Sequence, residues 1–218
     1  MSFDFIDISP LISERLAVYP GDVPFSRNIS RRFCDGDRLT LSSFAGTMHL
    51  GAHADAPSHY FPQGESIENL SLAPYFGPCQ VISLAKDPGS LIALEDVEPL
   101  SFRATRVLFR TASFADPGVW REDFVAFAPE AIAVLARGGV QLVGIDTPSL
   151  DPAQSEDLPA HQMIARHDMR ILEGLDLQAV LPGVYFLVAL PLKIAGADAT
   201  PVRAVLLKSD WLHSKINI

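Results

Sequence analysis

The histidine-rich stretch from Met48 to His59 constrains this chain more than any other feature. It holds three of the six histidines together with an aspartate, at His49, His53, Asp55 and His59. Imidazole and carboxylate are the side chains that bind borderline transition metals at neutral pH. All four positions have odd numbers, so on an extended chain they would point the same way. This composition, spaced by small residues, favours a metal site over a surface loop that happens to be rich in histidine.

A straight strand cannot bring His49 and His53 to one ion. At roughly 3.3 Å per residue they would lie about 13 Å apart, so the chain must bend between them. Gly51 is the place for that bend because glycine accepts positive φ, and Pro57 stiffens the exit from the stretch. A helix would also present the two imidazoles together, but Gly51 and Pro57 both oppose helix. We therefore predict a curved extended segment or loop with its polar groups directed inward.

The same stretch resembles the His-x-Gly-Thr-His-x-Asp-x-Pro-x-His signature of the metal-dependent cyclase family, which includes bacterial kynurenine formamidases. Every defining position matches except Ala52, which stands where the signature usually has threonine. That departure concerns one hydroxyl and not the ligands. The resemblance continues in the runs 144–151 and 190–196. It therefore covers almost the whole chain, with its most specific motif at 49–59.

A second group of candidate ligands follows further along the chain. His161 lies at the start of an expected short helix, and His167 is six residues later, so only one of them should enter a given site. Glu173 stands in an apolar stretch, where burial of a carboxylate is costly unless it is paired or bound to a metal. The alternative interpretation is that Glu173 lies on a solvated turn beside Gly174. From the residues alone, His161 and Glu173 can each be either a metal ligand or an ordinary side chain.

The resemblance implies how these groups would be used. It implies a binuclear site with two Zn²⁺ ions per subunit, Mn²⁺ being the alternative metal. His49, His53 and Asp55 would hold one ion. Asp55 would bridge to a second ion held by His161 and Glu173, since a carboxylate has two oxygens that can face two ions.

Two further residues receive roles on the same basis. His59 is left as the general acid or base, and its unperturbed pKa near 6.5 suits proton transfer at neutral pH. The alternative for His59 is a third ligand of the first ion. Tyr19 precedes the turn Pro20-Gly21, where an aromatic residue is common in the family and lies against the substrate. The alternative for Tyr19 is a ring that packs on its own turn.

The activity implied by the resemblance is zinc-dependent hydrolysis of N-formyl-L-kynurenine to L-kynurenine and formate, in tryptophan degradation through the kynurenine pathway. Two other functions stay open at this point. The first is another amidohydrolase of the same family, which would open isatin or a similar lactam. The second is a metal-binding protein without catalysis. The family is usually oligomeric, and a homodimer is the implied state.

Composition bounds the remaining possibilities. At 218 residues the chain is expected to form a single domain, 1–218. A net charge of −9 without a basic run argues against nucleic acid as a partner. We find no secretory signal and no apolar run near the roughly 20 residues of a membrane span, so a cytoplasmic location is expected. Cys34 and Cys79 are accordingly expected to be free thiols.

The pattern of elements indicates a mixed, strand-rich α/β fold, and the resemblance implies the swivelling β/β/α type. The helix 129–137 is the most clearly bounded, with Pro129 at its start and two glycines after its end. The segment 60–78 is expected to be an ordered loop, and a turn is expected at 18–22. Other helices are expected at 94–100 and 159–167, and strands at 3–8, 38–48, 79–85, 105–111, 140–146, 184–190 and 202–208.

Overall fold

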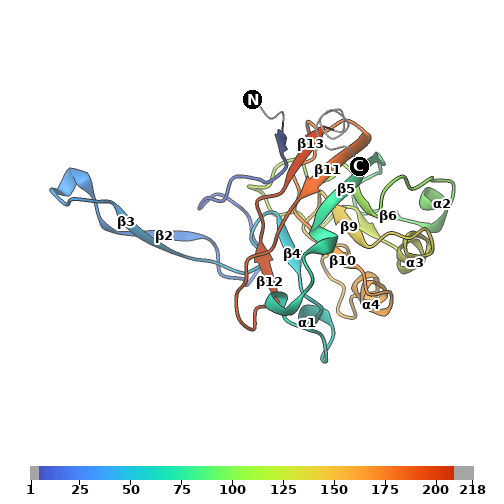
Figure 1. The fold of residues 1–218 in the computed structure, drawn as a ribbon, viewed down its shortest axis with the longest axis horizontal. Helices are drawn as coiled ribbons and strands as arrows, with labels where there is room; N and C mark the ends of the chain where they lie inside the picture. Colours follow the sequence, from blue (N-terminus) through green and yellow to red (C-terminus); the bar gives the residue numbers. More distant parts are fainter. Residues whose placement is uncertain (1–4, 209–218) are drawn as a thin grey trace.

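A seven-stranded sheet joins the first and last described segments of the chain in a computed structural model that describes residues 5–208 (Figure 1). Four neighbouring strands, β5, β7, β9 and β10, are parallel, while β11 runs antiparallel to both β5 and β13, and β1 antiparallel to β13. In sheet order the strands are β1 (Phe5–Asp7), β13 (Val205–Lys208), β11 (Gly183–Val188), β5 (Phe76–Ser83), β7 (Arg106–Arg110), β9 (Leu142–Ile145) and β10 (Arg170–Leu172).

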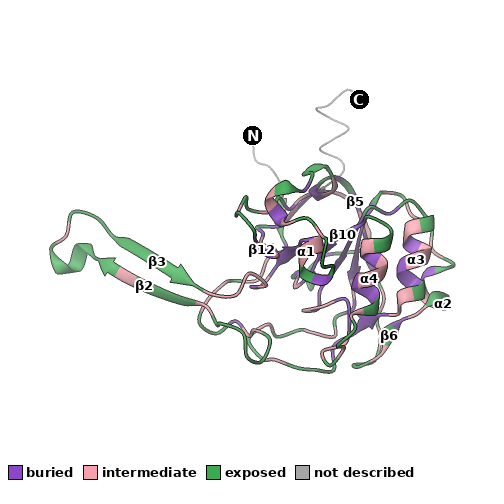
Figure 2. Cartoon of the chain, turned by 90° about the horizontal axis from the view of Figure 1, so that it is seen from below, coloured by how far each residue is buried: buried purple, intermediate pink, exposed green. Residues whose placement is uncertain are grey.

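Each face of this sheet is buried in its own core, because side chains alternate between the two faces along a strand. On β7, Val107 and Phe109 belong to the core under the helices, and Leu108 belongs to the opposite core. The helices α2 (Leu94–Val97), α3 (Pro129–Arg137) and α4 (Pro159–Arg166) lie on one side of the sheet (Figures 1 and 2). The other core reaches the histidine-rich stretch through the small residues Ala52 and Ala54.

The histidine-rich stretch is attached to the carboxyl end of the parallel strands. The short strand β4 (His53–Asp55) pairs with β12 (Ala199–Pro201) on one side. On the other side, His53 and Glu173 exchange backbone hydrogen bonds of 3.1 and 3.0 Å, so β4 joins the chain just beyond β10. A single-turn helix, α1 (Pro57–Tyr60), follows β4 and carries His59.

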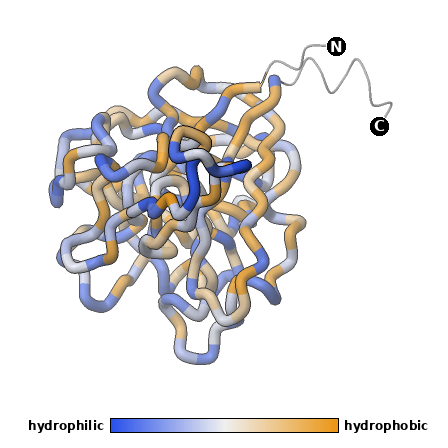
Figure 3. The backbone as a smooth tube through the Cα atoms, turned by 90° about the vertical axis from the view of Figure 1, so that its left-hand side faces the viewer, coloured by the Kyte–Doolittle hydropathy of each residue, from blue (hydrophilic) through white to orange (hydrophobic). Residues whose placement is uncertain are grey.

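A long two-stranded hairpin projects from the body. Its strands are β2 (Ser26–Arg31) and β3 (Leu41–Ala45), which pair antiparallel and carry the 3-10 turn η1 (Phe33–Asp35) at their far end. We call residues 23–47 the arm. The arm is almost entirely exposed in Figure 2, and Figure 3 looks onto it from its far end, where hydrophilic stretches dominate. The remaining short elements are η2 (Ile67–Asn69), η3 (Ala73–Tyr75), β6 (Leu91–Ile92) and β8 (Ala126–Phe127).

The structure confirms the mixed, strand-rich α/β class and most of the predicted elements. Helix α3 has the predicted bounds, and the turn before the arm has Gly21 at φ +100. The strand predicted at 38–48 is wrong in its extent: β3 ends at Ala45 and belongs to the arm, so it does not lead directly into His49. Residues 3–4 of the first predicted strand lie outside the described residues. Both Cys34 and Cys79 are free, as predicted.

Crossing a bilayer would need a longer and more apolar helix than any found between residues 5 and 208.

Candidate metal centre

Two glycines with positive φ bring the candidate ligands together. Gly51 has φ +65 and turns the chain between His49 and His53, as predicted. Gly174 has φ +64, and a Cβ on it would lie 2.2 Å from the carbonyl oxygen of Gly51. Only glycine permits this approach, which sets Glu173 beside the histidine-rich stretch. The Gly51 carbonyl also accepts a hydrogen bond of 2.8 Å from Nδ1 of His53, so Nε2 of that ring faces inward.

Asp55 is 1% exposed and lies within 3.5 Å of three imidazoles of the cluster. Its Oδ1 is 3.1 Å from Nδ1 of His49 and 3.5 Å from Nε2 of His53. Its Oδ2 is 3.4 Å from Nε2 of His161. The two oxygens of one carboxylate therefore face two different groups of imidazole nitrogens.

Glu173 closes the cluster on the side of His161. Its Oε1 is 3.4 Å from Nε2 of His161, and its Oε2 is 3.2 Å from Nε2 of His53. The backbone N–H of Leu150 donates to Oε1 at 2.6 Å and holds the carboxylate in this orientation. The predicted association of His161 and Glu173 with the histidine-rich stretch is thus present in the structure, whereas His167 is exposed at the end of α4.

The cluster has the properties of a site for divalent ions. Nε2 of His53 and both carboxylate oxygens of Asp55 are buried and lack any hydrogen-bond partner, which is costly for polar atoms that serve no other purpose. Nitrogen and oxygen ligands bind zinc at about 2.0–2.2 Å, so neighbouring ligand atoms of a tetrahedral ion lie about 3.3–3.6 Å apart. The separations above, from 3.1 to 3.5 Å, lie in that range or just below it. The residues present therefore fit the metal ions that the family resemblance implies.

The charges of the cluster point the same way. Burial disfavours the charged form of His49, but the carboxylates of Asp55 and Asp198 outweigh it and raise the pKa of His49 to about 9. Burial likewise opposes charge on His161, yet three surrounding carboxylates hold its pKa well above the usual value. Burial alone would raise the pKa of Asp55, and the imidazoles reverse the effect and lower it well below its usual value. Without a metal ion, the protonated imidazoles of His49 and His161 thus supply the positive charge that the surrounding carboxylates favour.

His59 lies at the open side of the cluster. It comes from α1, and 32% of its side chain is exposed. Its ring centroid is 4.2 Å from that of His49 and 6.2 Å from that of His161. Burial outweighs the nearby carboxylates at His59 and lowers its pKa, whereas the pKa values of His49 and His161 are raised. Because α1 is helical, the prediction of an extended chain across the whole stretch is wrong at its end.

A cavity of about 430 Å³ opens onto the metal cluster. Part of its lining is aromatic. Tyr19 is 52% exposed at its rim, donates a hydrogen bond of 3.2 Å from its hydroxyl to the carbonyl of Ala153, and meets the ring of Trp120 edge to face at 5.4 Å. Phe114 and Phe124 complete this wall. The placement of Tyr19 at the cavity was predicted, but the other three rings were missed, since nothing in their local sequence marks them.

Two more acidic residues were missed as parts of the site. Asp151 is completely buried, and its Oδ2 accepts a hydrogen bond of 2.7 Å from Nδ1 of His161. The same carboxylate accepts the N–H groups of Ala160 and His161, so it also caps the start of α4. Asp198 contacts His49 and His59 from the other end of the cluster. Asp151 ends the run 144–151, whose resemblance to the family could have marked it as a site residue. Asp198 lies in no such run.

Comparison with known proteins decides the family. The Cyclase family model matches residues 6–152. The chain belongs to this family. A kynurenine formamidase of Bordetella avium is 46% identical over 201 residues, which are 92% of this chain and 96% of the relative. The kynurenine formamidase of Delftia acidovorans is 44% identical and covered to 95%. This confirms the predicted resemblance, since both of these similar proteins are named kynurenine formamidase.

Solved structures agree. A structure described as a predicted metal-dependent hydrolase from Bacillus stearothermophilus has a TM-score of 0.80 and 29% identity, covering 94% of this chain and 98% of that one. Isatin hydrolase A from Ralstonia solanacearum has a TM-score of 0.78 at 21% identity, covering 95% and 92%. The second likeness shows a shared fold only. Two groups have ligand atoms that all lie within 4.8 Å of one another: His49, Asp55 and His59 form one, and His53, Asp55 and Glu173 form the other. The relatives and these groups together confirm the predicted class of metal-dependent hydrolase.

Proposed function

We propose that this protein hydrolyses the formamide of N-formyl-L-kynurenine to give L-kynurenine and formate, in tryptophan degradation. The observation that carries the proposal is Asp55, a buried carboxylate that turns each oxygen toward a different group of nitrogens and receives no hydrogen bond. A structural aspartate would be hydrogen-bonded at such burial. The relatives named kynurenine formamidase supply the substrate.

In this proposal the cluster holds two metal ions, with zinc as the expected metal and manganese as the alternative. His49, His53 and Asp55 hold the first ion. Asp55, His161 and Glu173 hold the second. When bound, such ions lower the pKa of water from 15.7 to about 7 and polarise a carbonyl oxygen, which is the chemistry that amide hydrolysis needs.

The remaining work falls to side chains of this chain. His59 is the general acid or base: it takes a proton from the attacking water and returns one to the aniline nitrogen that leaves. Burial lowers its pKa and so keeps it neutral and able to accept a proton at pH 7, while its partial exposure leaves it accessible from the cavity. Glu173 and Asp55 face the imidazoles of the cluster and offset their charge when no ion is bound.

The aromatic end of the cavity suits the substrate's ring. Tyr19, Phe114, Trp120 and Phe124 form an apolar wall that can accept a flat arylketone, with Tyr19 at the rim. We propose Tyr19 as a substrate-binding residue on this ground. Its hydroxyl is held by Ala153, so the ring has a fixed orientation.

We further propose that the protein acts as a homodimer. The arm gives the reason, since an isolated two-stranded hairpin is marginally stable in water. It exposes large apolar side chains, among them Phe33, Leu41 and Phe44 at 67%, 52% and 71%. Residues 26–45 also contain four arginines against two aspartates, on a chain whose net charge is −9. A second copy of this acidic chain would cover the arm. The cytoplasmic location expected from the sequence stays a prediction.

The test is absorbance-monitored hydrolysis of N-formyl-L-kynurenine by the purified protein. We expect turnover that a chelator abolishes and zinc restores, with two equivalents of metal per chain by elemental analysis. Turnover without metal, or one equivalent at full activity, would contradict the binuclear proposal. No turnover in a protein that holds two equivalents would contradict the substrate.

A lactam such as isatin is the second candidate substrate. The observation that favours it is that no lysine or arginine among the described residues lines the cavity. A neutral lactam needs no such partner, whereas the amino-acid tail of N-formylkynurenine carries a carboxylate. Assay of both substrates with one zinc-loaded preparation decides between them by the ratio of their kcat/KM values.

A further inference from the structure

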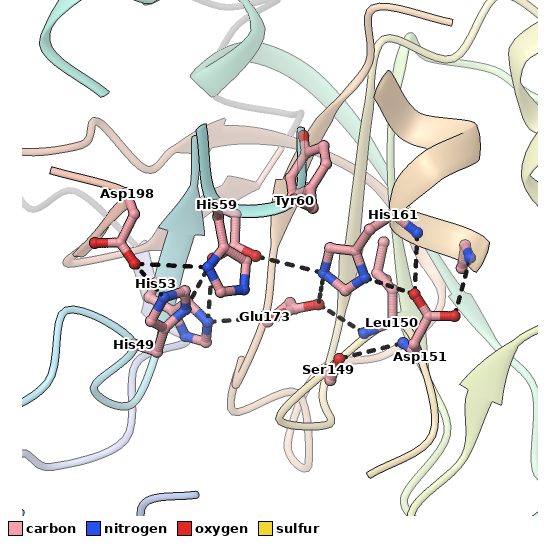
Figure 4. Close-up of polar contacts among 12 residues, drawn as sticks. His49, His53, His59, Tyr60, Ser149, Leu150, Asp151, His161, Glu173 and Asp198 are labelled. Atoms are coloured by element: carbon pink, nitrogen blue, oxygen red, sulfur yellow. Dashed lines mark hydrogen bonds and ion pairs between the residues drawn. The ribbon is translucent and has the colours of Figure 1, made fainter. Parts of the chain in front are cut away.

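Asp198 is an acidic residue of the metal cluster that none of the roles above uses. Its carboxylate oxygen Oδ2 lies 3.1 Å from Nε2 of His49 and 3.5 Å from Nδ1 of His59. Figure 4 shows it at the edge of the cluster, away from His161. One oxygen therefore contacts both a candidate ligand and the candidate acid or base.

Backbone hydrogen bonds fix the position of Asp198. The strand β12 begins at the next residue and pairs with β4, which carries two of the candidate ligands. The carbonyl of Asp198 accepts the N–H of Ala56 at 2.8 Å, and the carbonyl of Ala197 accepts the N–H of Ile67 at 3.0 Å. The carboxylate is thus placed by the same strand pairing that places His53 and Asp55. It is not a chance contact from a free loop.

The chemistry of imidazole gives this contact a consequence. A neutral imidazole has one N–H and one lone pair, so the partner of one nitrogen decides what the other can do. The 3.5 Å contact of Asp198 with Nδ1 of His59 is longer than an ordinary hydrogen bond. Because a carboxylate only accepts hydrogen bonds, closing that gap selects the form of His59 with hydrogen on Nδ1 and the lone pair on Nε2. The same oxygen can accept from Nε2 of His49, whose Nδ1 faces Asp55. Carboxylates commonly orient imidazoles in this way at metal sites.

We propose that Asp198 is a positioning residue, which fixes the tautomer and orientation of His59 so that Nε2 exchanges the proton during turnover, and which orients His49 through the same oxygen. This inference rests on the proposed function, in which His59 is the acid or base. In this proposal Asp198 does not bind the substrate, because its carboxylate acts through the imidazole of His59. Its removal should therefore lower kcat and leave KM nearly unchanged.

The kinetic test is Asp198→Asn in the metal-loaded enzyme. Asparagine has the same shape, but its NH₂ group can donate to Nδ1 of His59 and select the opposite tautomer. We expect kcat to fall about 10–100-fold, the usual cost of losing such an orienting group, at full metal content and with KM within about threefold. Glu68→Gln is the matched control. The carboxylate of Glu68 accepts a hydrogen bond from the N–H of Gly196, in the loop that also carries Asp198, and it contacts neither His49 nor His59. It should retain wild-type kcat.

A double-mutant cycle then shows whether Asp198 acts through His59. In a His59→Ala background, Asp198→Asn should cause little further loss, because both changes remove the same proton transfer. The proposal would be overturned if Asp198→Asn lowered kcat by the same factor in the His59→Ala background as in the wild-type protein. A wild-type kcat in Asp198→Asn would also overturn it, as would a loss of kcat that excess metal restores, since the residue would then act only on metal retention.

A spectroscopic test is independent of turnover. Proton-coupled ¹⁵N NMR of the imidazole rings should show hydrogen on Nδ1 of His59 in the wild-type protein, metal-free and zinc-loaded, and on Nε2 in Asp198→Asn. The His59→Ala variant identifies the signal by its loss. Hydrogen on Nε2 in the wild-type protein would overturn the proposal. Failure of the proposed function would look different: an intact Nδ1–H signal in a protein that does not hydrolyse the formamide.

Discussion

At the residue scale, the candidate site depends on what each nitrogen and oxygen faces. Asp151, Asp55 and Glu173 surround His161, so its Nδ1 is already taken by a carboxylate and only Nε2 is directed into the cluster. His53 is fixed in the same way by the carbonyl of Gly51. Both imidazoles are therefore oriented before any ion binds. These two side chains are almost completely buried, whereas 20% of the side chain of the third candidate ligand, His49, is exposed.

His59 is the residue whose two interpretations differ most clearly in a measurement. If it transfers protons, His59→Ala should keep the metal content of the wild type and lose about 10²–10⁴-fold in kcat. Elemental analysis and steady-state kinetics on the same preparation check both numbers. His167→Ala is the control, because that histidine is exposed at the end of α4. A variant that loses metal in parallel with activity would show that His59 is a third ligand of the first ion.

At the scale of elements, the contact between Gly51 and Gly174 holds the two ligand segments together. Gly174→Ala places a Cβ at positive φ and within 2.2 Å of the Gly51 carbonyl. We expect a fall in Tm and weaker metal binding, because the backbone must move apart at the centre of the site. Thermal unfolding and metal titration measure the two effects.

The matched control for this change is Gly139→Ala. Gly139 also has positive φ, at +81, but a Cβ there would meet nothing within 4 Å. It should cost only the strain of a left-handed conformation, about 1–2 kcal/mol, and leave metal affinity unchanged. Equal effects of the two substitutions would show that the contact with Gly51 does not matter.

The arm gives a prediction on assembly. Phe44 is 71% exposed on β3, so Phe44→Glu costs the isolated subunit little but would place a charge in a covered interface. We expect a shift from dimer to monomer in sedimentation, without change in the circular dichroism of the body. Leu181→Glu, at a similarly exposed position on the body, should stay dimeric. A wild-type protein that sediments as a monomer would remove the basis of this prediction.

Elements that are fixed by local sequence were predictable, and those fixed by distant contacts were not. Helix α3 carries its own proline start and glycine end, so its bounds follow from the chain alone. The candidate ligands at 49–59 could be proposed from the sequence because imidazoles at this spacing carry a chemical signal, and the structure brings them together. β10 has three residues, and its identity as a strand depends on pairing with β9. Asp198 reaches the site only because β12 pairs with β4, which no local pattern announces.

At the scale of the whole molecule, protons and metal ions compete for the same cluster. In the metal-free protein the pKa of His49 is about 9, above its ordinary value of 6.5. Folding therefore favours the protonated ring. The stability that this contributes is fully present below pH 6.5 and is lost as the pH rises through about 9. A bound ion needs an unprotonated nitrogen, so below pH 9 metal binding must displace that proton.

This competition predicts opposite pH trends for the two forms of the protein. The Tm of the metal-free protein should fall between pH 6.5 and 9, and His49→Gln should weaken that fall. Zinc affinity should rise over the same interval, by up to tenfold per pH unit for each displaced proton. Calorimetry at pH 7 in two buffers of different ionisation enthalpy should show release of at least one proton per chain. Binding without proton release would mean that His49 is neutral in the empty site, and the ion pairs of His49 with Asp55 and Asp198 would then not be the interactions that hold the metal-free cluster together.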